Sequence, residues 1–256
     1  MQSALEVRGL RVRYGAFEAV RGVDFTLAKG AILGIVGESG SGKSTIARAL
    51  MGLTPIASGA VEMSSSPQMI FQDAVGSLNP RMTVGMTLEE VIRLKSKKTS
   101  EPMEARLKRL LSLVGLSEAV LKQYPRELSG GQCQRVSIAR ALAAEPEILI
   151  ADEPVSALDV SVQARVLNLL RDLRQELGIS ILLIAHDLAV VKNVCDYVCV
   201  MERGCFVDAG PAEQVFSSPQ SDYTRNLLFT AAWLTVDRQN FSITHDGKQG
   251  VKVRYD

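Results

Sequence analysis

The stretch Gly37-Glu38-Ser39-Gly40-Ser41-Gly42-Lys43-Ser44-Thr45 fits the phosphate-loop pattern G-x-x-x-x-G-K-[ST]. The apolar run 31–36 before it predicts a buried strand, and residues 46–51, apolar at helical spacing and closed by Gly52, predict a helix. Between a strand and a helix, the glycines let backbone N–H groups turn inward around a polyphosphate, and the helix N-terminus adds partial positive charge. The stretch therefore predicts a nucleoside triphosphate site rather than a glycine-rich turn without a ligand.

Two side chains of this loop carry specific predicted roles. Lys43 is expected to reach the β- and γ-phosphates of the nucleotide, and the hydroxyl of Ser44 is expected to bind Mg²⁺. The nucleotide-binding positions predicted across the loop are Gly37, Ser39, Gly40, Gly42, Lys43, Ser44 and Thr45.

The composition is typical of a globular α/β protein. The 256 residues allow one large domain, or one domain with a helical insertion, and 46% of them are hydrophobic. The net charge of +1 provides no global attraction to nucleic acid. No segment approaches the roughly 20 apolar residues of a membrane span, and residues 1–6 lack the layout of a signal peptide. We therefore expect a cytosolic protein whose association with a membrane comes through a partner.

Three of the four cysteines, Cys195, Cys199 and Cys205, lie close together in the sequence. Their spacing matches no usual zinc or iron–sulfur pattern. Because they fall in a strand-like segment, we expect buried thiols that act as small hydrophobic side chains rather than metal ligands.

Polar residues follow two further apolar strands. Residues 148–151 run directly into Asp152 and Glu153, of which the first acid is expected to support Mg²⁺ and the second to polarise the attacking water. The predicted strand 180–185 ends at His186, where a group that reaches the γ-phosphate would stand. Buried acids at the end of a strand have few structural roles, so we interpret this pair as catalytic.

A second glycine-rich turn, Leu128-Ser129-Gly130-Gly131-Gln132, opens a helix predicted to reach Leu142. Serine followed by two glycines at a helix N-terminus is again anion-binding geometry. The residues alone leave another interpretation open, which is an ordinary N-cap with flexible glycines.

The other segments predict a mixture of strands and helices. Tyr14, between the strand-like runs 5–12 and 23–27, is either a half-buried strand residue or an aromatic that stacks on a base. Helical periodicity over 87–95 and 102–116 indicates a helical subdomain at about 74–136, and the second helix has Leu107, Leu110, Leu111 and Val114 on one face. The remaining expected elements are a helix at about 161–177, short strands within 196–208, a helix at about 221–233 and a polar tail at 235–256.

With these residues in place, the chain resembles the nucleotide-binding subunit of an ATP-binding-cassette (ABC) transporter from about residue 4 to 230. The resemblance implies the ABC ATPase fold over residues 1–234: a P-loop NTPase core with a mixed sheet, an antiparallel β subdomain and a helical subdomain. The matching elements, in the order of the family, are the adenine-stacking position Tyr14, the phosphate loop 37–45, the glutamine loop at Gln72, the signature loop 128–132, the acid pair Asp152-Glu153, the loop at Asp159 and the switch histidine His186.

The resemblance also implies roles for these residues. Two subunits would close on ATP, each ATP lying between the phosphate loop of one subunit and the signature loop of the other. Glu153 would act as general base and His186 would stabilise the γ-phosphate. The remaining implied roles are Lys43 on the phosphates, Ser44, Gln72 and Asp152 with Mg²⁺ and its waters, and Tyr14, Ser129, Gly130, Gly131, Gln132 and Asp159 as further nucleotide-site positions.

Two stretches narrow the resemblance to importers of peptides, nickel and metal–opine complexes: Phe71–Pro80 and Asp222–Leu228. The implied partners are membrane permease subunits, a second ABC ATPase subunit (identical or different) and, indirectly, an extracytoplasmic solute-binding protein, without nucleic acid. Residues 74–80, with Val75, Leu78 and Asn79-Pro80, are expected to form an exposed surface that couples the site to a permease.

The chain departs from the family pattern at several places. Ala74 stands where proline is common, Cys133 follows the signature glutamine, and the segment between Gly59 and Gln68 is short enough to trim a β-arm beside the nucleotide. No cysteine cluster of the kind that holds an iron–sulfur centre in some relatives follows Leu228.

Two other functions fit the resemblance less well. One is an ATPase subunit of a soluble complex such as the phosphonate-cleaving machinery, which co-purification with enzymes rather than permeases would reveal. The other is a cassette ATPase acting on DNA or ribosomes, which usually has a coiled-coil insertion or a second cassette. The sequence does not identify the cargo.

Overall fold

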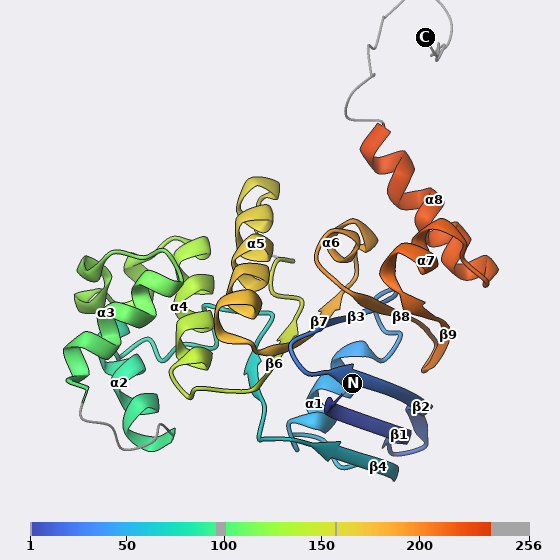
Figure 1. Cartoon of the computed structure of the whole chain (residues 1–256), viewed down its shortest axis with the longest axis horizontal. Coiled ribbons are helices and arrows are strands. Elements are labelled where there is room, and N and C mark those ends of the chain that lie inside the picture. The colour runs from blue at the N-terminus through green and yellow to red at the C-terminus, as the bar shows by residue number, and fades with distance from the viewer. Residues whose placement is uncertain (1, 96–100, 157, 237–256) are drawn as a thin grey trace, which may run out of the picture.

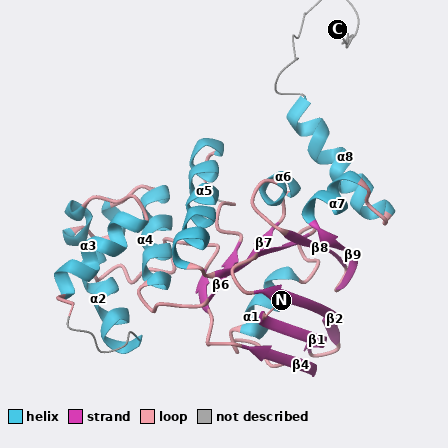
Figure 2. Cartoon of the chain, viewed as in Figure 1, coloured by secondary structure: helices cyan, strands magenta, loops and turns pink. Residues whose placement is uncertain are grey.

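The computed structural model describes residues 2–95, 101–156 and 158–236. Its centre is a six-stranded sheet whose first five strands run parallel, while the last is antiparallel to its neighbour (Figures 1 and 2). Short, almost wholly apolar runs form the parallel strands because both faces of the sheet are covered. In order across the sheet the strands are β5 (Gln68–Ile70), β6 (Ile148–Asp152), β7 (Ser180–Ala185), β3 (Ile32–Val36), β8 (Tyr197–Glu202) and β9 (Cys205–Pro211).

A second, antiparallel sheet has the order β2-β1-β4, from β2 (Phe17–Ala28), β1 (Ser3–Tyr14) and β4 (Ser58–Met63). The runs expected at 5–12 and 23–27 are the apolar parts of one long hairpin, which continues to a turn at residues 15–16. The strands are longer than the apolar runs because exposed polar residues alternate with buried ones along β2.

One helix separates the two sheets. α1 (Lys43–Leu50) follows the phosphate loop. Its side chains Ile46 and Leu50 are buried between two surfaces, of which one is formed by β1 and β2 and the other is one face of the larger sheet. This packing fixes the start of α1 beside the carboxyl end of β3.

The other face of the larger sheet is covered by five helices, which share one core with it. They are α4 (Gly130–Leu142), α5 (Val160–Leu177), α6 (Leu188–Lys192), α7 (Ala212–Ser217) and α8 (Asp222–Val236). Residues 237–256 of the predicted tail lie outside the described part of the chain.

Two further helices, α2 (Val84–Lys95) and α3 (Met103–Leu113), gather with α4 at one end of the molecule (Figure 1). The predicted apolar face of α3 and the residues after it is confirmed, since Leu107, Leu110, Leu111 and Val114 are all buried. Two short 3₁₀ helices, η1 (Glu118–Lys122) and η2 (Pro125–Glu127), connect α3 to α4.

The expectation that Leu78 lies on an exposed surface is wrong. Its side chain is 3% exposed and belongs to the core cluster that contains Leu88 of α2. The cause is a local turn, in which the Asp73 carboxylate accepts the N–H of Gly76 and the N–H of Leu78 bonds to the carbonyl of Val75. The turn directs Leu78 inward and leaves Val75 53% exposed.

The expectation of buried thiols holds for Cys195 and Cys199 and is wrong for Cys205, which is exposed as the first residue of β9. Burial raises the pKa of Cys199 to about 12, so that thiol stays neutral. Within the described ranges there is no group of three or more His, Cys, Asp or Glu side chains that could hold a metal ion. No helix among those ranges is long and apolar enough to cross a membrane.

Candidate functional site

Strand register brings the predicted site residues together. β3 and β7 pair so that Val36 lies opposite Ala185, which places the phosphate loop beside His186. Asp152 pairs with Ile184 on the other side of β7, and β5 pairs with β6 just before Gln72. Because the strands are parallel, their carboxyl ends meet at one edge of the sheet, where ligands bind in open α/β sheets.

Lys43 holds the phosphate loop in a closed curve. Its ammonium nitrogen donates to the carbonyl oxygens of Gly37 at 2.8 Å and Glu38 at 2.7 Å. Burial lowers the pKa of Lys43, and the nearby carboxylates of Glu153, Asp152 and Glu38 oppose that shift. The lysine is thus buried, yet surrounded by groups of opposite charge at the place where phosphates are expected.

The start of α1 is shaped for an anion. Gly42 is its N-cap residue with φ +112°, a left-handed conformation that favours glycine, and no side chain caps the helix. A Cβ at this position would lie 2.5 Å from the carbonyl oxygen of Ala19. The glycine therefore permits a close backbone approach, and the first N–H groups of the helix are not occupied by a capping side chain.

Asp152 and Ser44 form the candidate Mg²⁺ position. The Ser44 hydroxyl donates to Asp152 Oδ1 at 2.8 Å. Burial raises the pKa of Asp152, which is 4% exposed, while the hydrogen bond from Ser44 acts in the opposite direction. Two adjacent hard oxygen atoms fit Mg²⁺, which binds few protein ligands and takes the rest from phosphate and water.

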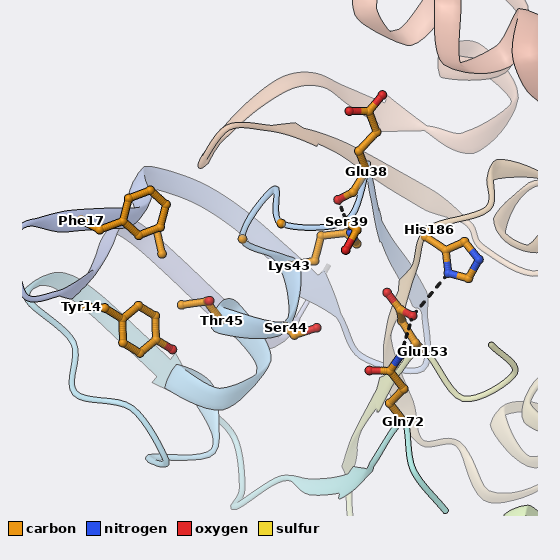
Figure 3. A pocket seen from close by; sticks show the side chains of 13 residues that line it. Tyr14, Phe17, Glu38, Ser39, Lys43, Ser44, Thr45, Gln72, Glu153 and His186 are labelled. Carbon is orange, nitrogen blue, oxygen red and sulfur yellow. Dashed lines mark hydrogen bonds and ion pairs between the residues drawn. The ribbon is translucent and has the colours of Figure 1, made fainter. Parts of the chain in front are cut away.

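Glu153 is the residue on which the polar groups of the site converge. Its Oε2 accepts the side-chain N–H of Gln72 at 3.1 Å and lies 3.3 Å from Nδ1 of His186 (Figure 3). Glu153 also has φ +45°, an unfavourable conformation for a residue with a long side chain. Strained backbone of this kind clusters at functional sites, which supports a catalytic role for this carboxylate.

A cleft of about 630 Å³ joins these groups to two aromatic side chains. Tyr14 ends β1 and is 46% exposed, and Phe17 begins β2 and is 61% exposed (Figure 3). Phe17 was not predicted from the sequence, although its position three residues after Tyr14, across a glycine turn, indicated a hairpin with two aromatics at its tip. The lining is Tyr14, Phe17, Ala19, Glu38, Ser39, Gly40, Gly42, Lys43, Ser44, Thr45, Gln72, Glu153 and His186.

The signature loop is not part of this lining. Ser129 caps α4, accepting the N–H of Gln132 at 3.3 Å, and the Gln132 side chain accepts the N–H of Ser129 at 2.9 Å. Asp159 likewise caps α5 by accepting the N–H of Val162. In a single chain, Ser129, Gly130, Gly131, Gln132 and Asp159 therefore lie away from the described walls of the cleft.

Comparison with known proteins agrees with this geometry. The family described as ABC transporter matches residues 20–156. The oligopeptide transport ATP-binding protein OppF of Salmonella typhimurium is 47% identical over 228 residues, covering 82% of this chain and 68% of that protein. OppF of Bacillus subtilis is 42% identical over 249 residues, covering 89% and 82%.

Solved structures of ABC cassettes have the same fold. CbiO1 of Clostridium perfringens, part of the ABC transporter complex CbiONQ, superposes with a TM-score of 0.77 at 26% identity, covering 93% of this chain and 96% of that one. The dimeric cassette MJ0796 gives 0.73 at 26% identity, covering 81% and 98%. A post-hydrolysis dimer of MJ0796 with ADP and Pi gives 0.71 at 26% identity, again covering 81% and 98%.

Proposed function

The chain belongs to the ABC transporter family, and we propose that it is the ATP-binding and ATP-hydrolysing subunit of an importer for oligopeptides. The observation that carries the proposal is the convergence of Lys43, Ser44, Glu153 and His186 around a single cleft at one edge of the sheet. The buried Asp152 lies next to this cleft, hydrogen-bonded to Ser44. Oligopeptides are proposed as the cargo because two relatives above 40% identity are named for oligopeptide transport. These names do not favour the phosphonate-cleaving alternative.

Nucleotide binding follows from the shape of the cleft. The rings of Tyr14 and Phe17 supply an exposed aromatic surface for the adenine base. The ammonium of Lys43 and the uncapped start of α1 supply positive charge for the β- and γ-phosphates. Mg²⁺, held by Ser44 and Asp152 with Gln72 as the predicted third residue, would neutralise charge on the phosphate oxygens.

Hydrolysis is assigned to Glu153. Its carboxylate accepts a proton from water, the water oxygen forms a bond to the γ-phosphorus, and the bond between that phosphorus and the bridging oxygen breaks to leave ADP. Gln72 and His186 both contact Oε2 of Glu153 and so orient the carboxylate toward the γ-phosphate side of the cleft. We propose His186 as the group that stabilises the γ-phosphate.

We propose that a second ATPase subunit completes the site. The signature loop begins α4 at Ser129, which is exposed, so a partner molecule can reach it. Ser129, Gly130, Gly131 and Gln132 would then contact ATP held by the partner, with Asp159 nearby. The dimeric state of the similar cassette MJ0796 supports this arrangement. The domain limits 1–234 and 74–136 stay predictions.

Coupling to the membrane is proposed at the surface beside Gln72. Phe71 is 37% exposed and Val75 is 53% exposed, and the two flank the residue that contacts Glu153. Apolar side chains that stay exposed next to a catalytic loop fit a partner contact. A permease docked there would place the protein at the inner face of the membrane.

Co-expression with its permeases tests the proposal. The detergent-solubilised complex should hydrolyse ATP faster when oligopeptide and binding protein are present. Val75→Asp should remove most of this stimulation, roughly tenfold or more for a central contact, with basal hydrolysis unchanged. Leu53→Asp, at a residue 60% exposed after α1, is the matched control. Co-purification with soluble enzymes in place of permeases would contradict the proposal.

A further inference from the structure

The segment Asp222–Leu228 marks the resemblance to peptide importers, yet none of its residues belongs to the described lining of the nucleotide cleft. In the structure it forms the beginning of α8. The hydroxyl oxygen of Tyr223 accepts the backbone N–H of Glu38 in the phosphate loop at 3.0 Å, across 185 positions in the sequence. The C-terminal helix thus touches the backbone of the nucleotide-binding loop directly.

The start of α8 is fixed by several hydrogen bonds. Asp208 of β9 is 8% exposed, and its carboxylate accepts the N–H groups of Gln220 at 3.1 Å and Ser221 at 3.0 Å. The hydroxyl of Ser221 accepts the N–H of Thr224 at 3.0 Å and so caps the helix. These bonds lie on both sides of Tyr223 in the sequence and hold the backbone from which its side chain projects.

The tyrosine ring is partly buried and packs against the main core together with Leu227 and Leu228. Burial raises the pKa of Tyr223, so the hydroxyl stays neutral near pH 7 and can accept the N–H of Glu38. A neutral, packed hydroxyl is a fixed hydrogen-bond partner rather than a mobile one.

The hydrogen bond from Glu38 to Tyr223 involves a peptide group that also binds the ammonium of Lys43. The carbonyl of Gly37 and the N–H of Glu38 belong to one peptide unit. Lys43 donates to that carbonyl at 2.8 Å, while Tyr223 accepts from that N–H at 3.0 Å. The orientation of this single peptide plane therefore links Tyr223 to the position of the ammonium group.

A second contact from the C-terminal half holds the same loop. Gly204, in the turn between β8 and β9, has φ +87° and donates its N–H to the carbonyl of Ser41 at 2.9 Å. These two hydrogen bonds hold the loop at Glu38 and at Ser41, on either side of Ser39 and Gly40. The face of the loop toward the cleft stays available to phosphate.

From this arrangement we propose that Tyr223 is a positioning residue, which orients the peptide between Gly37 and Glu38 so that the phosphate loop and Lys43 are preorganised for ATP. The inference rests on the proposed nucleotide binding. The proposal gives the segment Asp222–Leu228 a role in the nucleotide site. From the sequence alone, this segment indicated only the resemblance to one group of importers.

The test uses the full chain with Tyr223→Phe, which removes one oxygen and keeps the packed ring. The dissociation constant for ATP should rise about fivefold, the change expected for one lost hydrogen bond, while turnover at saturating ATP changes little. In the nucleotide-free protein, hydrogen exchange of the Glu38 amide should become faster. Tyr197→Phe, at an exposed residue that begins β8, should change neither quantity.

Three outcomes would overturn the inference. They are an unchanged ATP affinity in Tyr223→Phe, an unchanged exchange rate at Glu38, or faster exchange along α8 to the same degree as at Glu38, which would show only a loosened helix. Lys43→Ala separates this inference from the proposed function. If Lys43→Ala loses ATP binding and Tyr223→Phe does not weaken it, the inference alone fails. If Lys43→Ala binds ATP normally, the proposed site itself is wrong.

Discussion

The phosphate loop before α1 and the signature loop before α4 are both glycine-rich and both begin a helix. They differ in whether side chains accept hydrogen bonds from the backbone N–H groups at the start of that helix. α1 starts at Gly42 with no side-chain cap. α4 starts at Ser129 with a complete capping box, in which the side chains of Ser129 and Gln132 each accept the backbone N–H of the other. The first loop therefore keeps donors for a ligand, whereas the second satisfies part of its own.

The two loops also differ in whether they line the cleft. The phosphate loop lies in the cleft of about 630 Å³ with Glu153 and His186, and the signature loop is outside its described lining. A helix N-terminus alone does not determine function, because both loops have one. The two loops differ in whether a side chain caps the helix and in whether the proposed catalytic side chains Glu153 and His186 lie in the same cleft. We therefore propose that the phosphate loop binds ATP and that the signature loop completes the site of a partner.

The largest effect is expected from Glu153→Gln, which keeps the shape of the side chain and removes the general base. Turnover should fall by about two orders of magnitude or more, while ATP binding persists, because the cradle for phosphate is unchanged. Glu147→Gln, on the residue before β6 at the opposite end of that strand, is the control. Turnover at the wild-type rate in Glu153→Gln would contradict the role of Glu153 as general base beside the phosphate loop.

A pair of glycine substitutions compares the loops directly. Gly42→Ala places a Cβ 2.5 Å from the Ala19 carbonyl oxygen at φ +112°, whereas Gly130→Ala meets nothing closer than Leu158 Cδ2 at 3.8 Å. Strain of this kind costs about 1–3 kcal/mol, so ATP affinity should fall about tenfold or more in Gly42→Ala. Gly130→Ala should leave binding by the monomer unchanged, as isothermal titration would show. Equal losses in both variants would contradict the distinction.

The smallest effect concerns stability in the absence of nucleotide. The raised pKa of Asp152 means that the folded protein binds this proton more readily than the unfolded chain, so its charge destabilises the fold above that pKa. Asp152→Asn should therefore raise the thermal midpoint by about 1–3 °C at neutral pH. The gain should shrink as the pH falls and Asp152 becomes protonated. A lower midpoint at neutral pH would show that the carboxylate stabilises the nucleotide-free fold.

The sequence predicted the parts of this molecule that depend on local pattern. The strands at 31–36, 148–151 and 180–185 and the helix after Gly42 are confirmed, because apolar runs and a glycine loop define them without reference to the rest of the chain. Their convergence could be predicted as well, since parallel strands align their carboxyl ends.

The rest depends on the geometry of one local turn and on tertiary contacts, and the apolar pattern of the sequence records neither. Leu78 was expected on the surface because its segment is rich in turn residues, but the turn at Asp73 directs it into the core. The hydrogen bond between Tyr223 and Glu38 joins residues from opposite ends of the sequence. The role of Ser129 toward a partner's ATP stays a prediction, because a single chain contains only one half of that arrangement.

The most direct test of the account is ATP binding by the isolated monomer in two variants, Lys43→Ala and Ser129→Arg. Lys43 is buried inside the phosphate loop, whereas Ser129 is exposed and outside the described cleft lining. We expect Lys43→Ala to lose most of its affinity for ATP, and Ser129→Arg to bind ATP as the wild type does but no longer to hydrolyse it in the dimer. If Ser129→Arg abolishes binding by the monomer as fully as Lys43→Ala, both loops act on the same ATP and the account is wrong.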